Sequence, residues 1–163
     1  MLWAGLAAVA LLACAGTDAP AADPDPVPLS DQARVAGLRV TLADALSAAE
    51  RETLERIDVP MLVRLSALDW FEHESRFDLA GQVILEVEVL ALSLEGAVPV
   101  WLWRGLAGED WLEVRVRVHD ASGLHDDFVL TERTGVEGWE WRDADARLDR
   151  MARRLGRRIA ELL

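Results

Sequence analysis

The side chains best suited to chemistry lie close together in the sequence near position 120. His119-Asp120 and His125-Asp126-Asp127 flank the segment 120–123, whose Asp, Ser and Gly predict a turn. Imidazole and carboxylate groups bind divalent transition metals, and a hairpin would bring these groups together. Turns also favour Asp for its hydrogen bonds to the backbone, so we favour the interpretation without a metal and expect no cofactor. His119, His125 and Asp126 are kept as the weak candidates for metal ligands.

A second group consists of aromatic residues around a glycine-rich segment. Trp101, Trp103 and Trp111 bracket the segment 105–108, and Arg104 lies between the rings, where it can stack by a cation–π interaction. Such a group serves either as a contact surface for a partner protein, a glycan or the bilayer interface, or as a seam where a loop folds over a sheet. We favour the seam, and these four residues are the candidate partner surface if one exists.

Common catalytic patterns are missing from the sequence. The chain has no Lys, which excludes a Ser-x-x-Lys pair. His73-Glu74 is followed by Phe77 where a zinc metalloprotease would have its second His. Neither a P-loop nor the six-residue glycine motif of dinucleotide-binding proteins occurs. We therefore expect no catalytic residues and a protein that is not an enzyme.

The charge of the chain argues against one class of partner. The chain has 163 residues and a formal net charge of −12, and its 17 basic residues are all arginine. Affinity for nucleic acid comes first from neutralising phosphates, so this acidic chain is not expected to bind nucleic acid. The single cysteine excludes an internal disulfide.

That cysteine, Cys14, stands at the end of an uncharged apolar run over residues 2–16. The run is shorter than the about 20 residues of a membrane-spanning helix, and it suits the hydrophobic region of a secretory signal. Leu11-Leu12-Ala13-Cys14 resembles the bacterial lipobox. The resemblance implies that residues 1–13 are a cleaved signal peptide and that Cys14 carries a lipid anchor in the membrane.

The segment after the cysteine separates the anchor from the rest of the chain. Residues 17–28 are rich in Pro and Asp and cannot bury apolar area, which predicts an extended tether. We divide the chain into a signal peptide (1–13), lipidated Cys and tether (14–28) and a single domain (29–163). Ala15 and Gly16 lack the Asp that commonly retains lipoproteins at the inner membrane, so the resemblance implies an outer-membrane location facing the periplasm.

The first half of the domain has ambiguous periodicity. A stripe that begins at Val35, Leu38 and Leu42 and continues to Thr53 predicts a helix that Ser30 or Asp31 would cap. Ser47-Ala-Ala-Glu50 matches a capping box, and the alternative is that a second helix begins there. For residues 60–71 alternation and helical spacing compete, and we expect a strand that follows the end of the helix at Pro60.

The second half of the domain has clearer patterns. Residues 82–94 and 111–119 alternate apolar and charged side chains as half-covered strands do, and residues 128–134 return as a partner strand after the turn. Residues 144–162 have the four-and-three spacing of an amphipathic helix. The sequence thus predicts an α+β fold, an antiparallel sheet of about four strands flanked by an N-terminal and a C-terminal helix packed on one face.

The stretch 77–163 carries a family resemblance. It reads Asp78-Leu-Ala-Gly-Gln-Val, a long strand, the glycine-rich segment 105–108, a strand that ends in Asp120-Ala-Ser-Gly123, a last strand and a helix. This order resembles a family of bacterial envelope lipoproteins of unknown function. The family usually opens with a strand before its first helix, whereas residues 27–29 are too short to form one. The resemblance brings no catalytic residues with it.

These observations favour a lipid-anchored protein of the bacterial envelope. We expect a non-catalytic binding or assembly-support module that is joined to the membrane through Cys14 and has another envelope protein as its partner. The alternative is a small metal-dependent envelope hydrolase that uses the cluster of His119, His125 and neighbouring Asp residues.

Overall fold

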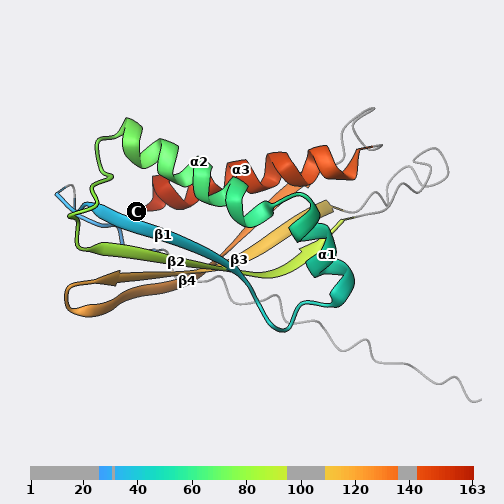
Figure 1. Ribbon diagram of the computed structural model, residues 1–163, viewed down its shortest axis with the longest axis horizontal. Helices are drawn as coiled ribbons and strands as arrows, with labels where there is room; N and C mark the ends of the chain where they lie inside the picture. Colours follow the sequence, from blue (N-terminus) through green and yellow to red (C-terminus); the bar gives the residue numbers. More distant parts are fainter. Residues whose placement is uncertain (1–25, 31, 95–108, 136–142) are drawn as a thin grey trace, which may run out of the picture.

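Two long helices lie on one face of a four-stranded sheet (Figure 1). The computed structural model describes residues 26–30, 32–94, 109–135 and 143–163. The elements are, in chain order, β1 (Val35–Leu42), α1 (Ala48–Arg56), α2 (Val59–His73), β2 (Val83–Ser93), β3 (Glu109–Asp120), β4 (Gly123–Gly135) and α3 (Ala144–Leu162). The sheet has the order β1-β2-β3-β4, in which β1 and β2 are parallel and the other neighbours are antiparallel. The predicted α+β class is confirmed, with a sheet that is mixed rather than purely antiparallel.

The prediction of a helix that begins at residue 30 or 31 was wrong, because residues 35–42 form strand β1. Val35 and Leu38 are buried, and β1 pairs along its length with β2, from Val35–Val83 to Leu42–Val89. Backbone pairing with a strand far along the chain overrides the helical spacing of these residues. The opening strand that the family resemblance implied is therefore present, at 35–42 instead of 27–29.

The alternative start of a helix at the capping box is confirmed. The Ser47 side chain accepts a hydrogen bond from the Glu50 N–H, and the Glu50 carboxylate accepts one from the Ser47 N–H. Two otherwise unpaired N–H groups of the first turn are satisfied in this way, which defines the first residue of α1.

The strand expected at residues 60–71 is also wrong, because α2 occupies this segment. Pro60 lies in the first turn of α2, where its missing N–H costs nothing, so it begins this helix instead of ending the previous one. The buried residues recur every four positions, Val59, Val63, Ala67 and Phe71. A strand would have put these four side chains on one face together with Met61 and Leu65, whereas the helix buries the four and leaves Met61 and Leu65 about half exposed.

The remaining elements agree with the sequence analysis. In β3 the buried row is Leu112, Val114, Val116 and Val118, and in α3 it includes Leu148, Met151, Leu155 and Ile159. Helix α3 packs against α2 so closely that a Cβ atom added at Gly156 would lie 2.3 Å from the carbonyl oxygen of Val63. The core therefore fills the space between the sheet and this pair of helices.

Both ends of the described domain lie together. The Leu29 N–H donates to the carbonyl oxygen of Leu163 at 2.9 Å, and the Val27 N–H donates to the Asp126 carboxylate at 2.8 Å. The segment that enters the domain is thus held beside the end of α3 and the β3–β4 hairpin. None of the helices that the structure describes has the length and apolar character needed to cross a membrane.

Candidate functional site

The residues outside the described ranges include Cys14, Trp101, Trp103 and Arg104, the expected signal peptide and most of the expected tether. Of the candidate partner surface only Trp111 is described; it lies in β3 and is partly buried.

The structure does not bring His119 and His125 together. His119 and Asp120 are consecutive residues of β3, so their side chains point to opposite sides of the sheet. His119 Nε2 lies 3.4 Å from Glu86 Oε2, whereas His125 Nδ1 lies 3.4 Å from Asp120 Oδ2. Within the described ranges there is no group of three or more His, Cys, Asp or Glu side chains placed to hold a metal ion.

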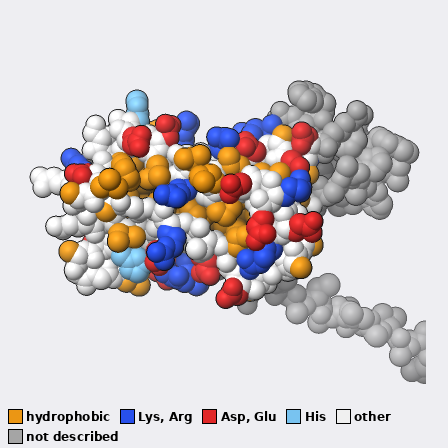
Figure 2. All heavy atoms as spheres, in the orientation of Figure 1, with side chains coloured by type: hydrophobic (Ala, Val, Ile, Leu, Met, Phe, Trp, Pro, Cys, Tyr) orange, Lys and Arg blue, Asp and Glu red, His pale blue; other side chains and the backbone are white. Residues whose placement is uncertain are grey.

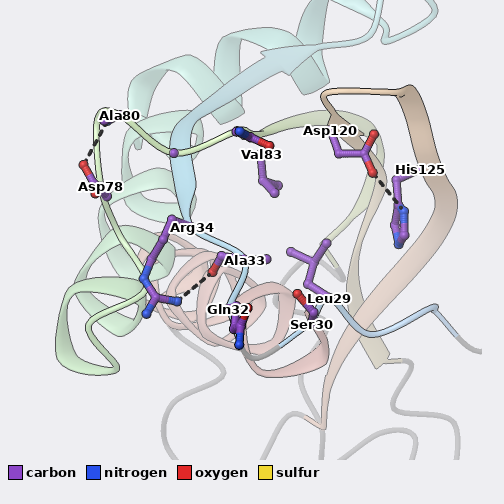
Figure 3. Close-up of a pocket in the computed structure, with 12 residues that line it drawn as sticks. Leu29, Ser30, Gln32, Ala33, Arg34, Asp78, Ala80, Val83, Asp120 and His125 are labelled. Carbon is purple, nitrogen blue, oxygen red and sulfur yellow. Dashed lines mark hydrogen bonds and ion pairs between the residues drawn. The ribbon is translucent and has the colours of Figure 1, made fainter.

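A depression of about 530 Å³ lies beside His125 and Asp120 at one end of the sheet (Figure 3). In Figure 3 this pair lies across the depression from Asp78, with Leu29 and Gln32 between them. The Asp78 carboxylate accepts a hydrogen bond from the Ala80 N–H at 2.9 Å, which is the contact of an Asx turn.

The Asp120 carboxylate has a similar structural role. The Ser122 hydroxyl donates to Asp120 Oδ1 at 2.6 Å and the Ser122 N–H donates to the same atom at 2.7 Å. The Ser122 hydroxyl is the main reason that the pKa of Asp120 lies below its usual value, and the Ser122 N–H is the next contributor. Both carboxylates of the depression therefore stabilise turns.

Charged side chains cover the face of the sheet that points away from α2 and α3. Arg117 lies 3.3 Å from the carboxylate of Glu88 on the neighbouring strand, and Arg115 lies 3.5 Å from that of Asp127. These cross-strand pairs belong to the polar half of the alternation in β2 and β3, and they keep that face of the sheet hydrated.

A second depression, which we call the arginine groove, lies between α2 and α3 and has a volume of about 330 Å³. It is lined by Ser66, Asp69, Trp70, Arg150, Arg153, Arg154 and Arg157. The guanidinium carbon of Arg157 lies 5.8 Å from the centre of the Trp70 ring, in cation–π range. Arg153 donates to the carboxylate of Asp149, one turn earlier on the same helix, at 2.9 Å. Figure 2 shows arginine and acidic side chains along the helical edge of the molecule.

A third feature, which we call the apolar edge, lies where α2 passes the open edge of β1. Met61 and Leu65 of α2 are 44% and 52% exposed. Beside them lies a groove of about 370 Å³, whose other lining residues are the apolar Leu38, Val40 and Pro60 and the charged Arg39, Asp58 and Arg64. Figure 2 shows hydrophobic side chains in a band across this face. Sequence analysis missed this surface, because a strand at 60–71 placed Met61 and Leu65 on the same side as the buried Val63 and Ala67.

No protein-family model and no curated protein matches this sequence at a significant level. Solved structures do match the fold. Protein XCC0632 from Xanthomonas campestris, assigned to the family DUF330, is 8% identical with a TM-score of 0.52, over 77% of this chain and 80% of that one. A variant of the PelC dodecamer from Paraburkholderia phytofirmans is 14% identical with a TM-score of 0.49, over 86% of this chain and 95% of that one.

A candidate lipoprotein from Caulobacter crescentus also matches, at 15% identity and a TM-score of 0.37, over 77% of this chain and 86% of that one. At such identities a likeness concerns the fold alone. The chain therefore shares the α+β fold of XCC0632 and is distantly similar to PelC and to the Caulobacter protein.

Proposed function

We propose that this protein is a non-catalytic binding or assembly-support module of the bacterial envelope. In this proposal a lipid on Cys14 holds it at the outer membrane, and the domain faces the periplasm at the end of a Pro- and Asp-rich tether. The lipobox resemblance and the composition of residues 17–28 support the anchor and the tether.

The observation that carries the binding role is the apolar edge. Met61 and Leu65 lie one helical turn apart and are each about half exposed, beside the groove along β1. Large exposed apolar side chains that lie together and are rimmed by charged residues, as here by Arg39 and Arg64, commonly mark a site of protein interaction. Burying a Met or Leu side chain fully is worth about 1.5–3 kcal/mol, so covering this pair would contribute substantially to binding.

The position of β1 adds to this argument. It is the first strand in the sheet order, so within the described residues one of its sides is unpaired with a further strand, apart from the bridge between Val35 and Phe77. Open strand edges accept extended segments of partners through backbone hydrogen bonds, while pockets beside them receive side chains. The apolar edge offers both features together.

Crosslinking in intact cells followed by capture of the full-length protein tests this proposal. The wild-type protein should retain one partner in stoichiometric amount, and Met61→Glu/Leu65→Glu should lose it, because two carboxylates would have to be buried in the contact. Mass spectrometry of the crosslinked species identifies the partner, including a second copy of this chain.

The matched control is Leu79→Glu/Leu124→Glu. These two leucines are 82% and 58% exposed and lie outside the residues that line the apolar edge. The control should keep the partner. Equal retention by both double variants would refute the role of the apolar edge, and metal-dependent turnover without any partner would refute the non-catalytic proposal.

A further inference from the structure

We infer that the arginine groove binds an extended acidic segment of a partner protein. This inference rests on the proposed binding function and names the chemistry of one partner contact. It depends on side chains of α3 and α2 that are distinct from the apolar edge.

The spacing of the arginines sets the shape of the ligand. Arg150, Arg153, Arg154 and Arg157 follow the i, i+3, i+4, i+7 pattern, which places them in one row along α3. With a rise of about 1.5 Å per residue, the row is roughly 10 Å long. Alternate side chains of an extended peptide lie about 6.5–7 Å apart, so two or three of its carboxylates match the row.

The end of the row near Trp70 is the most available for binding. Arg154 and Arg157 are exposed, and neither makes an ion pair with a carboxylate within the part of the chain that the structure describes. The Trp70 ring holds the Arg157 guanidinium by a cation–π contact and presents an apolar wall to the groove. A guanidinium that is already held in place loses less side-chain entropy when it binds a carboxylate.

The charge of the groove differs from that of the whole chain. Its lining contains four arginines and one acidic residue, Asp69, whereas the chain carries a net charge of −12. At an ionic strength of 0.15 M, charges separated by more than about 8 Å are largely screened. An acidic segment in the groove would therefore respond mainly to these arginines, of which Arg153 is already paired with Asp149, and to Asp69.

Other anionic partners fit this geometry less well. A single phosphate is best held by donors that converge on one point, whereas these arginines are spread along a line. A membrane-surface helix must insert its apolar side, and in α3 the apolar residues Leu148, Met151, Leu155 and Ile159 are buried in the core. The phosphate backbone of nucleic acid is disfavoured by the acidic character of the chain.

Fluorescence anisotropy with the full-length lipidated protein in detergent tests this inference. The probe is a labelled peptide of alternating Glu and Thr, and a Lys–Thr peptide of equal length is the control ligand. The acidic peptide should bind, and its affinity should fall as salt is raised, since the contact consists of screened charges. The basic peptide should not bind.

Two double variants that remove the same charge distinguish binding in the arginine groove from a general effect of the protein's net charge. Arg154→Gln/Arg157→Gln should weaken peptide binding by about tenfold or more. Arg39→Gln/Arg64→Gln removes the same charge from residues that line the groove beside β1 and should change the affinity by less than about twofold. Equal effects of the two double variants, or no binding by the wild-type protein, would overturn the inference.

Competition identifies other occupants. Inorganic phosphate that displaces the peptide at equal charge concentration, or phosphatidylglycerol vesicles that bind through Arg154 and Arg157, would overturn a peptide ligand. If Asp18→Asn/Asp23→Asn/Asp25→Asn raised the peptide affinity by about tenfold, the chain's own acidic segment would be the occupant instead. Met61→Glu/Leu65→Glu should leave peptide binding unchanged, so this inference and the proposed function fail separately.

Discussion

The guanidinium of Arg147 donates to the carboxylate of Asp110 inside the domain, with Nε 2.5 Å from Oδ2. The two side chains are 3% and 0% exposed. The contact joins the first turn of α3 to the beginning of β3, across 37 residues of sequence. A charged pair in this position is well satisfied only while both partners are present.

Removing one member of this pair should therefore be costly. Asp110→Ala or Arg147→Met should each lower the free energy of unfolding by about 3–5 kcal/mol, because a charge remains buried without its partner. The double variant Asp110→Ala/Arg147→Met should lose less than the two single losses together, measured by urea denaturation. Strictly additive losses would show that the two side chains do not stabilise the fold as a pair.

Replacing Gly156 with Ala should destabilise the contact between the helices. The new Cβ would lie 2.3 Å from the carbonyl oxygen of Val63, so α2 and α3 would have to move apart. The cost of about 1–3 kcal/mol should exceed the gain of about 1 kcal/mol in helix propensity. Gly37→Ala is the control, because nothing lies within 4 Å of its added Cβ. Thermal unfolding of both variants gives the comparison, and a Gly156→Ala protein as stable as wild type would contradict the close approach.

The apolar side of α3 should be indispensable for folding. Leu155 is fully buried, so Leu155→Ala should lower the free energy of unfolding by about 2–5 kcal/mol. Glu161→Ala, at an exposed position of the same helix, should change it by less than about 0.5 kcal/mol. A protein truncated before Asp143 that still melts cooperatively would show that α3 is dispensable.

The turn at residues 120–123 should make a small contribution to stability that depends on pH. The folded state lowers the pKa of Asp120, mainly through the Ser122 hydroxyl, so it favours the ionised carboxylate. This contribution is present above the ordinary Asp value of about 4 and is lost as the pH falls through the lowered folded-state pKa. Ser122→Ala should move the pKa of Asp120 back toward its ordinary value, which carboxyl NMR titration would detect. An unchanged pKa would show that the hydroxyl is not the cause.

The lipid anchor can be tested independently of the domain. Cys14→Ser should leave an unprocessed precursor that no longer partitions into detergent, because both acylation and cleavage depend on the thiol. Mass spectrometry of the mature wild-type protein should find acyl chains on Cys14. An unmodified Cys14 in the mature protein would remove the basis for the outer-membrane assignment.

Local patterns in the sequence predicted a helix or strand correctly wherever the residues fitted only one periodicity or one helix cap. The alternation of Leu112, Val114 and Val116 predicted β3, and the spacing from Leu148 to Ile159 predicted α3. The Ser47–Glu50 capping box marked the beginning of α1 through hydrogen bonds within one turn of the chain. Each of these signals involves residues that are close in sequence.

Local patterns in the sequence did not predict how the side chains of the candidate sites are arranged. His119 and His125 lie near one turn in the sequence, yet they contact Glu86 and Asp120 respectively, because a pleated strand directs successive side chains to opposite faces. The arginines of α3 were visible in the sequence, but their arrangement beside Trp70 depends on how α2 packs. The half-exposed Met61 and Leu65 required α2 itself to be recognised as a helix.

The sequence alone determined the α+β class, the strands of the second half and the amphipathic C-terminal helix. Only the tertiary structure decided that residues 35–42 form a strand, since Val35 and Leu38 fit a helix equally well until β2 is available for parallel pairing. It also decided that Asp110 and Arg147 meet in the core. Both outcomes depend on partners more than 30 residues away, and the burial and hydrogen bonding that favour them exist only when the sheet and helices pack together.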